Sequence, residues 1–174
     1  MTKKEFIKRV AKEKKDLLNE FVSILKKKKI PFCVIGGLAV NAYAEPVVSL
    51  DLDVVIAVER LDDLVSFLPS EYRIKEFSNS INISAPFSDL RIQIQLDKRY
   101  QDFINRAIQK EVLGYKLPVA SIKDVLKGKI WAFQDKERRP SKRQKDLADI
   151  IRLIEVDKGL IELIPEDIKK KLEF

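Results

Sequence analysis

The chain of 174 residues has the length of one domain, with 45% hydrophobic residues and 34 Lys or Arg against 27 Asp or Glu, a formal net charge of +7. It has no histidine and one cysteine, Cys33, which excludes an intrachain disulfide, histidine-ligated zinc and Ser-His catalysis. No apolar run approaches the roughly eighteen residues of a membrane span, and the charged N-terminal segment lacks the apolar core of a signal peptide. We therefore expect a cytoplasmic protein with no membrane partner.

The apolar pattern predicts an α/β (α+β) protein, with a small mixed β-sheet, helices on one face and a helical C-terminal part. We expect a single domain over 1–174, made of an N-terminal helix (1–30), a sheet core (31–118) and the helical part (119–174). In chain order, helices are predicted over 3–28, 38–43, 61–67, 99–109, 122–133, 140–154 and 165–172, and strands over 32–35, 51–58, 72–77, 80–85, 90–97 and 111–117.

Two carboxylates, Asp51 and Asp53, stand on the second predicted strand. Because side chains alternate between the faces of a strand, both project from the same side. Two adjacent acids repel each other unless a cation lies between them, and Mg²⁺ takes carboxylate oxygens together with waters and substrate phosphates. The alternative is a pair of solvated surface acids.

Gly36 and Gly37 follow the first predicted strand and open the next helix. Such a turn lets backbone N–H groups approach a phosphate closely. Together with the two acids, the turn predicts metal-assisted handling of a nucleoside triphosphate (NTP).

Residues 32–57 resemble the nucleotidyltransferase superfamily, especially its small AbiEii-type toxin members. That group carries a strand, Gly-Gly or Gly-Ser, a helix and then Arg-x-Thr-x-Asp-h-Asp-h-h, where h is apolar. The last segment reads Val47-Val48-Ser49-Leu50-Asp51-Leu52-Asp53-Val54-Val55 here, so Ser49 matches the hydroxyl position and Val47 replaces the arginine. A lysine at 129 and the run Lys145-Asp146-Leu147-Ala148-Asp149 extend the resemblance towards the C-terminus.

The resemblance implies that Asp51 and Asp53 are catalytic ligands of Mg²⁺ or Mn²⁺. The residues expected to bind the nucleotide are Gly36, Gly37, Ser49, Lys129 and Lys145.

The superfamily generally adds a third acid from a later strand, but strand 90–97 presents Gln93 and Gln95 on the corresponding face. An amide oxygen can bind Mg²⁺, although it carries no charge. The candidates for completing the metal site are Gln93, Gln95, Asp89 and Asp97. The alternative is that the glutamines are ordinary polar residues on an exposed face.

Three functions follow from these features. The first is a Mg²⁺-dependent nucleotidyltransferase that moves a nucleoside monophosphate (NMP) from an NTP to an unknown hydroxyl acceptor, with RNA and protein among the candidates. The second is a catalytically weak or inactive NTP-binding regulator of the same fold, of the toxin–antitoxin type. The third is a basic nucleic-acid-binding module in which the acids are incidental. The net charge and the basic segment 135–145 suit a polyanion, although lysine runs also suit solvated helix ends.

Overall fold

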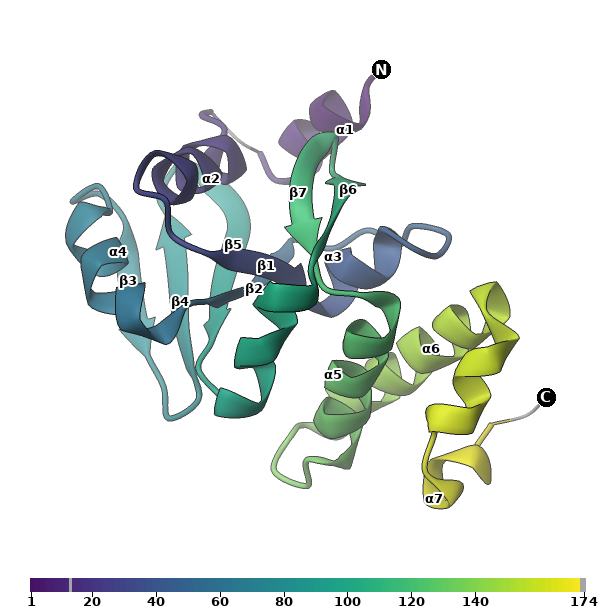
Figure 1. The fold of residues 1–174 in the computed structure, drawn as a ribbon. Coiled ribbons are helices and arrows are strands. Elements are labelled where there is room, and N and C mark those ends of the chain that lie inside the picture. The colour runs from purple at the N-terminus through teal and green to yellow at the C-terminus, as the bar shows by residue number, and fades with distance from the viewer. Residues whose placement is uncertain (13, 173–174) are drawn as a thin grey trace.

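The computed structural model describes residues 1–12 and 14–172 and is built around a seven-stranded mixed sheet (Figure 1). Its strand order is β3-β4-β5-β2-β1-β7-β6, and the pairs β2/β5 and β1/β7 are parallel while the others are antiparallel. The strands are β1 (Phe32–Ile35), β2 (Asp51–Ile56), β3 (Arg73–Glu76), β4 (Ser80–Ala85), β5 (Ser88–Gln95), β6 (Ile108–Val112) and β7 (Tyr115–Val119).

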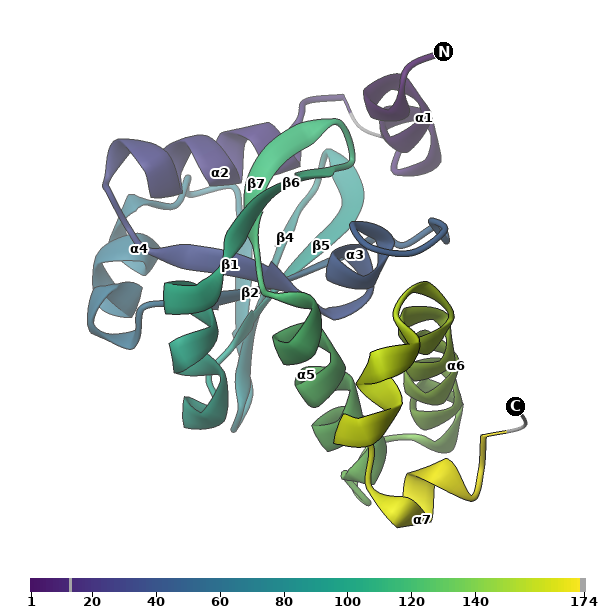
Figure 2. The ribbon, with the colours of Figure 1, turned by 45° about the vertical axis from the view of Figure 1, so that its right-hand side comes forward.

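Helices lie beside the sheet and in a C-terminal group. The α-helices are α1 (Lys3–Val10), α2 (Leu17–Lys27), α3 (Gly36–Asn41), α4 (Leu61–Phe67), α5 (Ile122–Gln134), α6 (Pro140–Val156) and α7 (Glu166–Lys169), with 3₁₀ turns η1 (Val58–Arg60), η2 (Lys98–Arg106) and η3 (Lys158–Leu163). Figures 1 and 2 show α2 and α4 beside the sheet, and α5 and α6 packed together in a separate C-terminal group. None of the described helices is long and apolar enough to cross a bilayer.

The expected mixed sheet and helical C-terminal part are confirmed. The apolar positions of β2 and β5 are buried, as their alternation predicts: Leu52, Val54, Ile56, Leu90, Ile92 and Ile94. The predicted helix start at Ser121 is also confirmed, because its hydroxyl accepts a hydrogen bond of 3.2 Å from the backbone N–H of Asp124.

The prediction of one helix over 3–28 was wrong. Helix α1 ends at Val10, and α2 begins after Asp16, whose carboxylate accepts the N–H of Asn19. Between them, the chain pairs with the β4–β5 region: the backbone N–H of Lys14 donates to the carbonyl of Phe87 in the β4–β5 turn, and Ala11 accepts the N–H of Asp89 on β5. Helical spacing of apolar residues alone does not reveal this long-range pairing.

The predicted helix over 99–109 and single strand over 111–117 were also wrong. A 3₁₀ segment, η2, is followed by the hairpin β6/β7. The turn of this hairpin is Leu113-Gly114, with φ values of 52° and 84°. Two successive positive φ angles are typical of the two-residue turns that join antiparallel strands, so the chain reverses where the sequence pattern suggested a continuous strand.

Candidate active site

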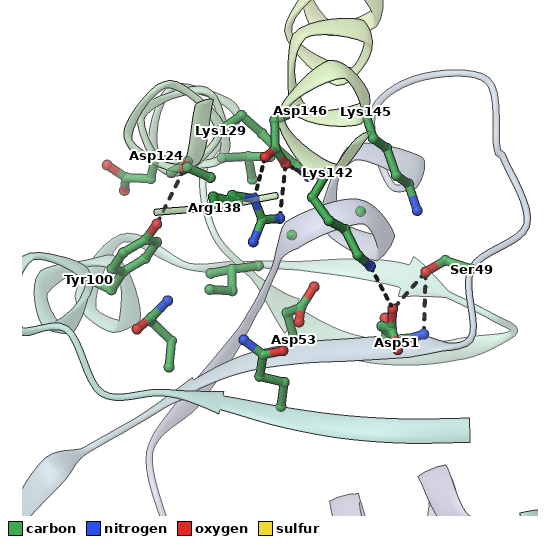
Figure 3. Close-up of a pocket in the computed structure, with 18 of the residues that line it drawn as sticks. Ser49, Asp51, Asp53, Tyr100, Asp124, Lys129, Arg138, Lys142, Lys145 and Asp146 are labelled. Atoms are coloured by element: carbon green, nitrogen blue, oxygen red, sulfur yellow. Dashed lines mark hydrogen bonds and ion pairs between the residues drawn. The ribbon is translucent and has the colours of Figure 1, made fainter. Parts of the chain in front are cut away.

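A cleft of about 170 Å³ lies between the sheet and the helices α5 and α6 (Figure 3). The β1–α3 junction, β2, β5, η2, α5 and α6 all contribute side chains to it. Apart from the alternatives Asp89 and Asp97, the residues expected to bind metal or nucleotide line this cleft: Gly36, Gly37, Ser49, Asp51, Asp53, Gln93, Gln95, Lys129 and Lys145. Positions that lie far apart in the sequence are thus brought to one place.

The carboxylate of Asp51 is held by cations from two sides. The guanidinium Nε of Arg91, its neighbour on β5, lies 2.8 Å from Oδ1. The ammonium of Lys142 lies 4.0 Å from Oδ2, and Figure 3 shows it reaching across the cleft from α6. With 29% of its side chain exposed, Asp51 is open to a ligand entering the cleft.

Asp53 is the more desolvated acid. Burial raises its carboxyl pKa to about 6, against the opposing effect of Lys129 and with a contribution from the charge of Asp51. A cation placed between the acids would relieve this desolvation and repulsion.

The diglycine turn fits closely behind these acids. Gly36 has φ +70°, and a Cβ there would collide with the carboxylate of Asp53. A Cβ on Gly37 would meet only the hydroxyl of Ser49, at 3.9 Å. That hydroxyl accepts the backbone N–H of Asp51 at 3.3 Å, so Ser49 also fixes the start of β2.

Lys129 is buried in an ion-pair network. Its ammonium lies 3.1 Å from Asp146 and 2.7 Å from Asp149. Burial acts to lower its pKa, but Asp149 and Asp146 outweigh this effect and raise it. Arg138 also binds Asp146, at 2.6 Å, and Arg152 binds Asp149 at 2.8 Å. Lys129 therefore lines the cleft while it ties α5 to α6.

Lys145 is exposed and extends from α6 into the cleft (Figure 3). Lys142, three residues earlier on the same helix face, lines the cleft too. Lys142 and Arg138 were not predicted as site residues, because the sequence pattern showed them only as members of the basic segment 135–145. The signal was the three-residue spacing of Lys142 and Lys145 after Pro140, a residue that suits the first turn of a helix.

The structure separates the four candidates for a third metal ligand. Asp97 caps η2 and pairs with Arg99 at 2.7 Å, and Asp89 is exposed at the other end of β5; neither lines the cleft. Gln95 accepts the backbone N–H of Asp97 at 3.0 Å through its side-chain oxygen. Gln93 is the direct neighbour of Asp53 in the parallel register.

The donor atoms present suit a hard divalent cation. Over residues 1–12 and 14–172, no group of three Asp, Glu or Cys side chains converges as a metal site. Two carboxylates and the amide of Gln93 are nevertheless oxygen donors, which Mg²⁺ and Mn²⁺ prefer. Beside Gln93, the side-chain oxygen of Asn82 is buried without a hydrogen-bond partner in the described part of the chain. That acceptor can take an amide hydrogen of Gln93 and leave the oxygen of Gln93 for a cation.

Comparisons with known proteins agree with this fold. The model of a family described as nucleotidyl transferase AbiEii toxin, type IV toxin–antitoxin system, matches residues 23–174. No curated protein sequence matches the chain.

Solved structures share the architecture at low sequence identity. The structure of ANT(2'')-Ia in complex with adenylyl-2''-tobramycin has a TM-score of 0.62 and 15% identity, covering 89% of this chain and 96% of that one. The lincomycin-bound lincosamide adenylyltransferase LnuA has a TM-score of 0.53 and 12% identity, covering 78% and 95%. An antigenic nucleotidyltransferase-like protein from Paracoccidioides brasiliensis has a TM-score of 0.52 and 20% identity, covering 78% and 73%.

Proposed function

Because the chain belongs to the family of AbiEii toxin nucleotidyl transferases, we propose that it transfers an NMP unit from an NTP to a hydroxyl acceptor with the help of Mg²⁺ or Mn²⁺. The observation that supports this most is the convergence in one cleft of the diglycine turn, the two acids of β2 and the lysines of α6. Because the proposed reaction consumes an NTP, we propose that it takes place in the cytoplasm.

The residues have distinct roles in this proposal. The backbone around Gly36 and Gly37 approaches the triphosphate, and Ser49 orients the start of β2 beside it. Lys142 and Lys145 contribute positive charge from α6. Asp51 and Asp53, with Gln93, hold the divalent cation, which when bound neutralises charge on the phosphate oxygens.

The chemical step is a substitution at the α-phosphorus. The acceptor oxygen forms a bond to that phosphorus, the bond to the bridging oxygen breaks, and pyrophosphate leaves while the acceptor loses its proton. The protein contributes mainly by positioning the reactants and stabilising charge. The candidate acceptors are RNA, protein and small hydroxyl compounds, the last because one structural neighbour is a lincosamide antibiotic adenylyltransferase and another is bound to adenylyl-2''-tobramycin.

The test is calorimetric titration of Mg²⁺ or Mn²⁺ with each NTP, comparing the native chain with the double variant Asp51→Asn, Asp53→Asn. We expect metal-dependent NTP binding in the native chain and its loss in the variant. Incorporation of label from an α-labelled NTP then identifies the acceptor. Absence of NTP binding in the native chain would refute the proposal.

A second candidate is an NTP-binding regulator without turnover, which the neutral Gln93 beside Asp53 favours. It predicts NTP binding without exchange of label between pyrophosphate and NTP. Observed exchange would exclude the regulator and support the transferase.

A further inference from the structure

We propose that this site works with a single divalent cation per bound NTP, and that Lys142 supplies the second positive charge at Asp51 and the phosphates. The inference rests on the proposed function and adds to it a catalytic residue and a metal stoichiometry. It follows from the charges around the two acids of β2.

The first argument concerns the acids. Two carboxylates carry the charge needed for one divalent cation, and the residue beside Asp53 on the next strand is the neutral Gln93. In the described part of the chain, no third carboxylate joins them. A second divalent cation would lack an anionic protein ligand of its own.

The second argument concerns the cations already present. Arg91 holds one oxygen of Asp51 at 2.8 Å, and Lys142 approaches the other at 4.0 Å. Arg138 and Lys145 line the same cleft. A second divalent ion would enter a region that already holds several positive side chains, and like charges repel.

The third argument concerns how Lys142 is positioned. Its helix is fixed by Asp146, whose carboxylate is 1% exposed and binds both Lys129 of α5 and Arg138 from the α5–α6 connection. Lys142 itself is 39% exposed and reaches Asp51 only at the limit of an ion pair. The backbone of the lysine is thus anchored, while its ammonium can turn from Asp51 towards phosphate oxygens.

The stoichiometry is tested by native mass spectrometry of the chain with Mn²⁺ and an α,β-methylene NTP analogue. We expect one Mn²⁺ per nucleotide complex in the native chain and two in Gln93→Asp, which adds the missing acid. Ser84→Asp is the matched control, since it adds a carboxylate on β4 beside Arg91 but not beside Asp53. Its nucleotide complex should contain one Mn²⁺, as in the native chain. Two Mn²⁺ in the native complex would overturn the inference while leaving the proposed function intact. Failure to bind the analogue at all would count against the proposed function itself.

The role of Lys142 is tested by exchange of labelled pyrophosphate into NTP, measured with the acceptor that label incorporation identifies and with its NMP product, from which the reverse reaction starts. Removing one preorganised positive group from a transition state costs about a hundredfold in rate, so we expect Lys142→Gln to lower kcat by about that factor with a smaller change in KM. Lys142→Arg should restore most of the rate. In the double variant Lys142→Gln, Gln93→Asp, which binds a second Mn²⁺, kcat should be at least about tenfold higher than in Lys142→Gln. An exchange rate unchanged in Lys142→Gln, or no recovery in the double variant, would contradict the assignment.

Discussion

The backbone at Gly36 is constrained by its own conformation and by the carboxylate of Asp53. Gly36 adopts φ +70°, in the region that side chains rarely adopt, and the carboxylate of Asp53 occupies the space where a Cβ would stand. Gly37, the next residue, has neither constraint. Two adjacent glycines therefore differ in how replaceable they are.

We expect Gly36→Ala to lower the free energy of unfolding by about 1–3 kcal/mol, the cost of a strained backbone conformation, and to displace Asp53. Gly37→Ala is the control, and it should leave stability unchanged or raise it by up to about 1 kcal/mol, because alanine favours helix. Denaturant unfolding and Mn²⁺ titration of both variants measure the difference. Equal stability of the two would contradict the strain argument.

A second residue-scale prediction concerns Lys129, whose side chain is 10% exposed between Asp146 and Asp149. Removing one partner from a buried ion pair costs about 3–5 kcal/mol. Because each acid keeps an arginine, Arg138 or Arg152, we expect Lys129→Met to cost about 3 kcal/mol in denaturant unfolding. A loss below about 1 kcal/mol would mean that the arginines alone satisfy both acids.

At the scale of elements, the spacing of apolar and capping residues correctly predicted those helices and strands that depend on interactions between neighbouring residues. Helix α4 and strand β4 lie where the apolar spacing placed them, and α5 starts at its predicted cap, Ser121. The errors arose where distant segments pair: the bonding of Lys14 to Phe87 divides the N-terminal helix, and hairpin β6/β7 completes the sheet beside β1. Such pairings depend on the assembled sheet, which a single sequence does not display.

The end of α2 offers an element-scale prediction. Lys29 has φ 52°, and the bonds from Lys29 to Lys26 and from Ile30 to Leu25 close the helix in the pattern that favours glycine. Since Lys29 is exposed, we expect Lys29→Gly to raise the free energy of unfolding by about 0.5–1 kcal/mol. Lys27→Gly, at the last residue of the same helix, should lower it by up to about 1 kcal/mol. Thermal and denaturant unfolding distinguish the two, and a destabilised Lys29→Gly would refute the cap argument.

At the scale of the whole molecule, the site exists only because two parts of the chain meet. Asp51, Asp53 and the diglycine lie within one short stretch of the sequence, where their pattern could be identified. Lys142 is distant in the chain and reaches the site only because α6 packs beside the sheet. The folded chain also buries groups that titrate at high pH. Burial raises the pKa of the Cys33 thiol on β1 and of the Tyr100 phenol on η2, each to about 12.

These raised values predict a loss of stability in alkali. In the unfolded chain the thiol and phenol titrate near 9.0 and 10.0, so above these values the unfolded state releases protons that the folded state retains. The contribution of these two groups to the free energy of unfolding is therefore fully present below about pH 9. It declines as pH rises towards 12, by up to about 1.4 kcal/mol per pH unit for each group. Denaturant unfolding of the native chain and Cys33→Ala between pH 8 and about 9.5, below the range in which unfolded tyrosines titrate, checks this. The variant is less stable at pH 8 because it loses buried volume, but its free energy of unfolding should fall less steeply with pH. Parallel dependences on pH would show that Cys33 does not contribute to the decline.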